Sequence, residues 1–137
     1  MQHDPELVAE TRGWLRRAAV DLGAGAVSCS ANPPFAGDAL FHAQQAAEKA
    51  MKAFLSWHGK PFRKTHNLAE IGLVCAEIDG ALEPLLRRAA LLTDYAWKYR
   101  YPGEPEDPPR EEAEAALALA REVYEAILAR LPEEVRP

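Results

Sequence analysis

Hydrophobic residues recur every three to four positions over most of the chain, which is the spacing of one face of an α-helix. The clearest amphipathic stretches span about residues 5–29, 38–58, 65–78, 82–99 and 110–131. No stretch shows a sustained alternation of apolar and polar residues, so there is nothing from which to build a sheet. The pattern predicts an all-α fold, an up-and-down bundle of four or five mostly antiparallel helices.

Local signals refine where these helices begin and end. Asp4 precedes Pro5, and a capping side chain followed by a proline is typical of a helix start. By the same reasoning Asp38 is expected to cap the second helix and Thr65 to open the third. Closely spaced prolines within residues 102–109 predict a loop before the last helix, because they remove hydrogen-bond donors and restrict their neighbours.

Composition is that of an ordinary globular protein. The chain has 137 residues, of which 48% are hydrophobic and 27% charged, so we expect a single domain over residues 1–137. No apolar run approaches the roughly 20 residues needed to cross a bilayer, which predicts a cytoplasmic protein. The net charge of −5 argues against broad binding of a phosphate backbone. Cys29 and Cys75 are far apart in apolar helical contexts and are interpreted as buried thiols.

The predicted helix 38–58 carries a polar stripe within an arc of about 160°. The stripe includes Gln45, Glu48, Lys49 and Lys52. One interpretation is a solvated face stabilised by Gln45–Lys49 and Glu48–Lys52 pairs four residues apart, each worth about 0.2–0.5 kcal/mol. The other is a groove or dimer surface in which the lysines bind an anion, Gln45 supplies hydrogen bonds and Glu48 orients the lysines.

A basic loop leads into the third predicted helix. Lys60, Arg63, Lys64 and His66 gather where backbone donors and the helix dipole favour an anion. The sequence thus predicts a local phosphate site there. The alternative is an exposed loop in which His66 only caps or packs.

Aromatic and cationic residues interleave at the end of the fourth predicted helix, over residues 95–102. Arg100 and Tyr101 suit stacking on a nucleobase and pairing with a phosphate. Alternatively, Trp97 packs in the core while Lys98 and Arg100 interact with the helix carboxyl end. The four histidines show no His-x-x-x-His pattern and no glycine-rich phosphate loop is present, so neither a metal nor a cofactor is expected.

Three segments, taken together and in order, resemble the HEPN family: residues 41–55, 64–68 and 99–102. The resemblance covers nearly the whole chain and is to the prokaryotic type associated with minimal nucleotidyltransferases. It implies an up-and-down helical bundle, usually a homodimer, often encoded beside a nucleotidyltransferase in operons of toxin–antitoxin type. Three tryptophans and broad alanine-rich faces on a small bundle also favour a homodimer.

Many HEPN proteins are metal-independent ribonucleases that use an arginine followed four to six residues later by a histidine. Arg100 stands in a similar place, but no histidine follows it. We therefore expect no catalytic residue, and instead a homodimeric partner of a nucleotidyltransferase that binds a nucleotide or phosphate rather than RNA. The candidate site residues are Gln45, Glu48, Lys49, Lys52, His66, Arg100 and Tyr101.

Two other functions stay open at this point. The first is a ribonuclease toxin that assembles its site across the dimer, with His42 or His66 supplying the missing histidine. The second is an interaction module whose polar stripe simply makes the dimer. In the main hypothesis, Lys49, Lys52, His66 and Arg100 converge in space.

Overall fold

A computed structural model describes residues 3–102 and 106–137 of the chain, and all of its regular structure is helical within that part. The α-helices are α1 (Pro5–Ser30), α2 (Ala36–Trp57), α3 (Leu68–Ile78), α4 (Glu83–Ala89) and α5 (Arg110–Leu128). Short 3₁₀ segments accompany them: η1 (Gly80–Leu82), η2 (Ala90–Ala96) and η3 (Glu133–Val135). The predicted all-α bundle is confirmed. None of the helices in the described part is long and apolar enough to cross a membrane.

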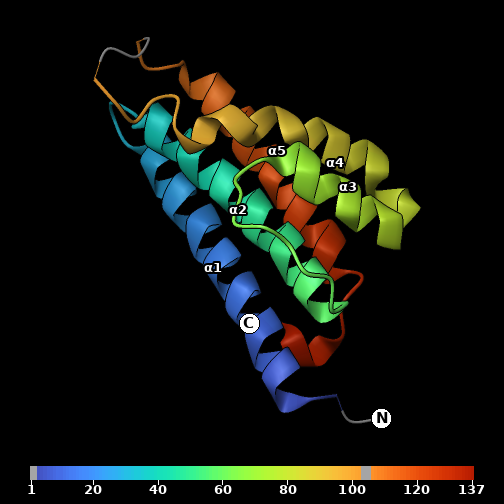
Figure 1. The fold of residues 1–137 in the computed structure, drawn as a ribbon. Coiled ribbons are helices and arrows are strands. Elements are labelled where there is room, and N and C mark those ends of the chain that lie inside the picture. The colour runs from blue at the N-terminus through green and yellow to red at the C-terminus, as the bar shows by residue number, and fades with distance from the viewer. Residues whose placement is uncertain (1–2, 103–105) are drawn as a thin grey trace.

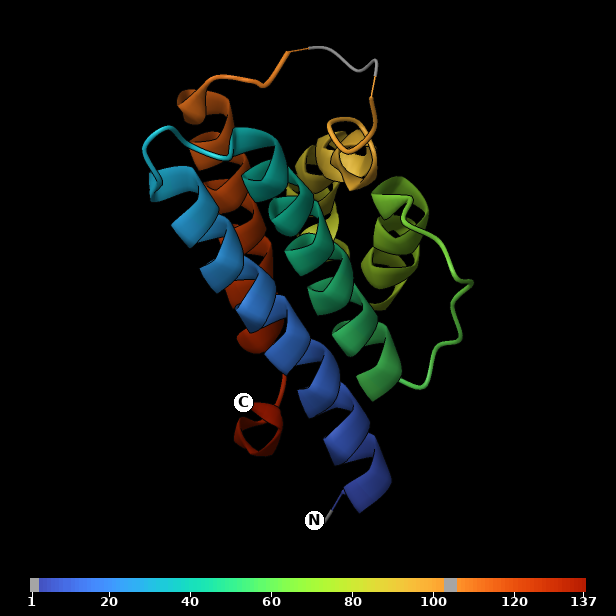
Figure 2. The ribbon, with the colours of Figure 1, turned by 90° about the vertical axis from the view of Figure 1, so that its left-hand side faces the viewer.

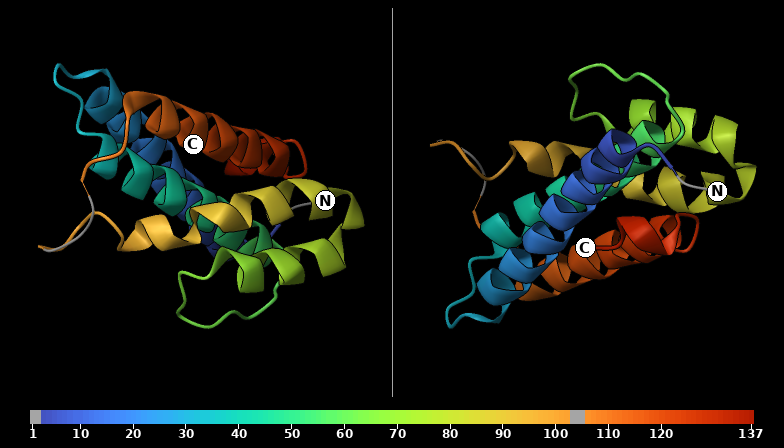
Figure 3. Two further views of the ribbon diagram at one scale, coloured as in Figure 1. Left: turned by 90° about the horizontal axis from the view of Figure 1, so that it is seen from above. Right: turned by 90° about the horizontal axis from the view of Figure 1, so that it is seen from below.

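Helix α2 forms the centre of the bundle (Figure 1). It packs against α1 and α5 along much of its length, and against α3 and η2 on another side. Figures 2 and 3 show α3 and α4 on the side of α2 away from α1. Because so many elements surround it, α2 is buried over most of its circumference, including part of its polar stripe.

The helix starts agree only partly with the local signals. Asp4 caps α1, its carboxylate accepting from the Glu6 amide at 3.0 Å. The third helix instead begins after Asn67, whose side chain accepts from the amides of residues 69 and 70. Thr65 forms a separate turn by accepting from the Asn67 amide. Asp38 lies inside the first turn of α2, which begins after Phe35 without a side-chain cap, so both predicted caps were wrong.

The fourth predicted helix differs most from the structure. Its α-helical part ends at Ala89, and η2 continues it with three residues per turn. Thr93 contributes to the change, because its hydroxyl donates to the Ala90 carbonyl at 2.8 Å and accepts from the Leu68 amide at 3.1 Å. The change of pitch rotates the following residues, so Trp97 is 50% exposed instead of packing in the core.

The core collects aliphatic side chains from all five helices around the alanines of α2. Its largest fully buried side chains include Phe54, Leu15, Leu40, Met51 and Ile127. Cys29 and Cys75 are buried and unpaired, as interpreted from the sequence. Burial raises the pKa of the Cys75 thiol to about 12, which keeps it protonated at neutral pH.

Candidate functional site

The polar stripe of α2 divides into two groups that face different neighbours. One group faces the loop of residues 58–67, and we call it the Glu48 cluster: Gln44, Glu48, Lys52 and His66. The other faces α1, and we call it the Asp21 cluster: Asp21, Asp38, His42 and Lys49. The two lysines of the stripe therefore have separate partners.

Glu48 is the hub of its cluster and is only 3% exposed. One carboxylate oxygen accepts from the Gln44 amide at 3.0 Å and lies 2.7 Å from His66 Nδ1. The other oxygen lies 2.9 Å from Lys52 Nζ. Gln44 also donates to the His66 carbonyl at 3.1 Å, which ties the loop to α2. The carboxylate is thus fully paired, as a buried charge must be.

Two aromatic rings complete the surroundings of Lys52. Its ammonium nitrogen lies 5.6 Å from the ring centroid of Trp14 on α1 and 5.6 Å from that of Phe62 in the loop. These distances fit cation–π attraction, which strengthens when the cation is desolvated. Lys52 is only 7% exposed. Its counter-charge is Glu48 and its ammonium packs between two aromatic rings, so its charge is already balanced inside the protein.

The Asp21 cluster holds Lys49 against α1. Lys49 Nζ lies 2.6 Å from one Asp21 oxygen, and His42 Nδ1 lies 2.8 Å from the other. His42 Nε2 is 3.4 Å from Asp38, which also accepts from the Ser28 hydroxyl at 2.6 Å. Sequence reasoning missed Asp21, which lies just off the apolar face of α1, because nothing in the local pattern singles it out.

Arg100 lies near the start of α2, about two helical turns from Glu48. Its guanidinium carbon is 3.8 Å from the ring centroid of Phe41, near the start of α2. Gly37 lets Tyr99, the residue before Arg100, lie close to α2, because a Cβ at position 37 would be only 2.9 Å from Cβ of Tyr99. The side chain of Tyr101 is 62% exposed. Gln45 lies between the two ends and donates to the Gln44 side-chain oxygen at 2.7 Å.

The expected convergence of the four cations is therefore found only in part. The row that we call the α2 row runs from Arg100 on Phe41, past Gln45, to His66 on Glu48. Phe41 and Glu48 are seven residues apart, so the row is about 10 Å long. Lys52 joins it through Glu48, whereas Lys49 is turned away towards α1.

The basic loop offers less charge than its composition suggests. Arg63 forms two hydrogen bonds with the Glu70 carboxylate, at 2.6 and 3.2 Å, and these bonds raise the pKa of its guanidinium. The start of α3 is capped by Asn67, which uses backbone donors that an anion would need. The start of α3 therefore offers fewer backbone donors to a phosphate than the sequence predicted.

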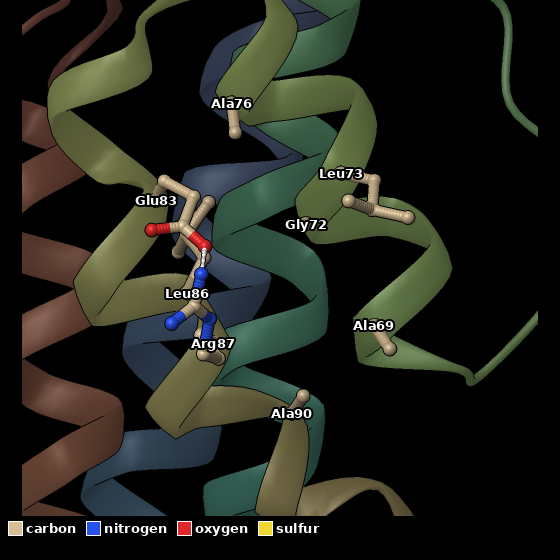
Figure 4. A pocket seen from close by; sticks show the side chains of 8 residues that line it. All are labelled: Ala69, Gly72, Leu73, Ala76, Glu83, Leu86, Arg87 and Ala90. Carbon is tan, nitrogen blue, oxygen red and sulfur yellow. Dashed lines mark hydrogen bonds and ion pairs between the residues drawn. The ribbon is translucent and has the colours of Figure 1, made fainter.

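An apolar pocket of about 180 Å³ lies apart from both clusters, between α3 and α4 (Figure 4). Ala69, Gly72 and Leu73 form one wall and Leu86 the other, while the Glu83–Arg87 ion pair borders it. None of the candidate site residues lines this pocket. Within the described part of the chain, no group of three His, Cys, Asp or Glu side chains could hold a metal ion.

Comparisons with known proteins identify the family. The sequence-family model of the HEPN domain matches residues 11–131, so the chain belongs to the HEPN family. A solved structure that it resembles is the crystal structure of TT1696 from Thermus thermophilus, at 28% sequence identity and a TM-score of 0.72. That alignment covers 89% of this chain and 98% of TT1696. A comparison with curated proteins gave no match.

Proposed function

We propose that this HEPN protein is a non-catalytic, homodimeric partner of a minimal nucleotidyltransferase, in a pair of toxin–antitoxin type, and that it binds a nucleotide or phosphate. The observation that carries the binding proposal is the α2 row. An exposed guanidinium on an aromatic ring stands at one end, an amide lies in the middle, and an exposed imidazole stands at the other. A mononucleotide presents complementary groups in a comparable length.

The charges of the row indicate which residues would contact the ligand. Lys49 and Lys52 are each paired with a carboxylate, so they stabilise the site without offering free charge. Positive charge for a phosphate comes from Arg100, and from His66 when its ring is protonated. Gln45 and Tyr101 would supply polar and stacking contacts, while Glu48 orients His66.

The proposal that the protein does not cleave RNA rests on its histidines. A general base must reach the proton that it removes, and it needs a free acceptor to do so. Both ring nitrogens of His42 lie against carboxylates, those of Asp21 and Asp38. His66 Nδ1 lies against Glu48, which does not prevent the other ring nitrogen from acting as a base, but His66 stands at the far end of the row from Arg100.

One observation favours the alternative, a metal-independent ribonuclease toxin with its site at the dimer interface. His42 and Arg100 both contact Phe41: the His42 ring centroid is 5.4 Å from that of Phe41, on which the guanidinium lies. An arginine and an aspartate-bound histidine in one neighbourhood could serve RNA cleavage.

Incubation with RNA separates the two functions. We expect single-stranded and structured RNA to remain intact in EDTA over hours at micromolar protein, because His42, which shares Phe41 with Arg100, has both ring nitrogens against carboxylates. Gel electrophoresis of labelled RNA measures this. Cleavage that disappears in both Arg100→Ala and His42→Ala variants would establish the ribonuclease and reject the non-catalytic proposal.

The nucleotidyltransferase partner is supported by the family resemblance alone and needs its own test. The tagged full chain, purified from its own cells, should retain a small nucleotidyltransferase in near-equal amount, identified by mass spectrometry. A tagged Leu73→Asp variant, altered at an exposed position on α3, serves as a surface control. Recovery of the wild-type chain with no nucleotidyltransferase, under conditions that preserve other complexes, would count against this part of the proposal.

A further inference from the structure

His66 and Glu48 form a carboxylate–histidine pair with one ring nitrogen held and the other accessible. The Glu48 carboxylate is 3% exposed and lies 2.7 Å from His66 Nδ1, while the His66 side chain is 66% exposed. A buried carboxylate that holds one nitrogen of an exposed imidazole makes the other nitrogen a better base and nucleophile. Binding of a phosphate by the α2 row uses the charge of a protonated His66 and leaves this arrangement without a role.

The contacts of Glu48 define which ring nitrogen is free. Its other oxygen lies 2.9 Å from Lys52 Nζ, so the carboxylate has a counter-charge and only accepts hydrogen bonds. In a neutral His66 ring the proton is therefore on Nδ1, and the lone pair is on Nε2. Among the residues that the structure describes, none forms a hydrogen bond or an ion pair with His66 Nε2.

The backbone on both sides of the His66 ring is fixed. Gln44 donates to the His66 carbonyl at 3.1 Å, and the next residue, Asn67, caps α3. The imidazole is thus oriented before any reactant arrives, which lowers the entropic cost of a reaction at Nε2.

The other three histidines each lack part of this arrangement. His42 has carboxylates on both ring nitrogens. His58 is exposed, and within the described ranges no carboxylate bonds its ring. His3 pairs with Glu134 through Nδ1, but that glutamate side chain is 42% exposed, so water competes for it. His66 therefore combines a buried carboxylate with an accessible nitrogen.

We propose that His66 is a phosphoryl acceptor, which takes a phosphoryl group on Nε2 from a phosphoramidate. The Nε2 lone pair forms the new N–P bond while the P–N bond of the donor breaks, and the donor nitrogen leaves as ammonia with that electron pair. The Nδ1 proton stays on the ring, and the Glu48 carboxylate balances the positive charge that the ring gains.

The surroundings of His66 suit the product. Lys64 is exposed two residues earlier, and α3 begins directly after Asn67. A cation and the positive end of a helix dipole both stabilise a phosphoryl group. Phosphorylated His66 places negative charge at the end of the α2 row, so it would oppose the binding of a nucleotide phosphate there. This consequence rests on the proposed function, whereas the modification itself does not.

Labelling of the native full chain with phosphoramidate at mildly alkaline pH compares the histidines within one molecule. Site-resolved mass spectrometry should show His66 phosphorylated at least about tenfold faster than His58, because only His66 has the buried carboxylate. In concentrated urea the two rates should become nearly equal, since unfolding separates His66 from Glu48. Equal rates in the folded chain, or a preference for His66 that survives unfolding, would overturn the proposal.

A conservative variant tests the part played by the carboxylate. Glu48→Gln removes the charge and keeps the size of the side chain, and circular dichroism shows whether it is folded. The ratio of His66 to His58 labelling should fall at least about fivefold. Glu70→Gln is the matched control, because Glu70 pairs with Arg63 of the same loop, and it should keep the wild-type ratio. A folded Glu48→Gln protein with the wild-type ratio would reject the proposal. Nucleotide titration plays no part in this measurement, so the two proposals fail separately.

Discussion

Replacing Glu48 with alanine is expected to lower the free energy of unfolding by about 3–5 kcal/mol, which is the usual cost of leaving a buried charge unpaired. The substitution removes the acceptor for Gln44 and the counter-charge of Lys52, whose ammonium is buried between two aromatic rings. It also releases His66 and with it the loop that crosses α2. Urea unfolding, followed by circular dichroism, measures the change.

A double variant shows whether the unpaired charge is the cause. Glu48→Leu combined with Lys52→Met replaces the ion pair by apolar side chains of similar size, and such replacements are often neutral for stability. The double variant should therefore be more stable than Glu48→Ala by at least about 2 kcal/mol. A Glu48→Ala protein that loses less than about 1 kcal/mol would mean that Lys52 finds solvent or another partner, contrary to the buried cluster described above.

Replacing Arg100 with alanine is expected to weaken nucleotide binding by about 10- to 100-fold. A hydrogen bond to a charged group contributes about 1.5–3 kcal/mol, and about 1.4 kcal/mol corresponds to a tenfold change in affinity. Stability should change little, because the side chain is exposed and rests on Phe41. Isothermal titration of wild type and variant with AMP and ATP provides the comparison.

Lys98→Ala is the matched control for that experiment. Lys98 is also a cation, two residues away, but its ammonium lies over the Tyr99 ring, at 5.5 Å, and not on the α2 row. It should bind nucleotide almost as wild type does. Equal losses in the two variants would indicate a general effect of positive charge at this end of the bundle, and the specific role of Arg100 would be rejected.

Periodicity was enough to predict the helices and their buried faces, because a helix that buries one face needs apolar residues about every 3.6 positions in the sequence. It failed at η2, where the change of pitch depends on the Thr93 hydroxyl bonding the Leu68 amide of another element. It failed likewise for the exposure of Trp97, which follows that change. Contacts between elements that are distant in sequence decided both cases.

The same limit applies to the candidate site. Glu48 and Lys52 are four residues apart on one helix, and their predicted pair is present at 2.9 Å. The expected pair of Gln45 with Lys49 is replaced by Lys49 with Asp21 and by Gln45 with Gln44. Spacing along one helix cannot indicate that a carboxylate on α1 will lie nearer than the neighbour one turn away. Only the packing of α1 on α2 determines that choice.

Titration of the wild-type protein with ATP and AMP tests the central claim most directly, since the proposed function requires the α2 row to hold a nucleotide or phosphate. We expect saturable binding with one site per chain and a dissociation constant below about a millimolar, weakened by salt because phosphate contacts are electrostatic. Heats no larger than those of dilution, with millimolar nucleotide and with inorganic phosphate alike, would contradict the proposed nucleotide site. The α2 row would then be only a structural feature of the bundle.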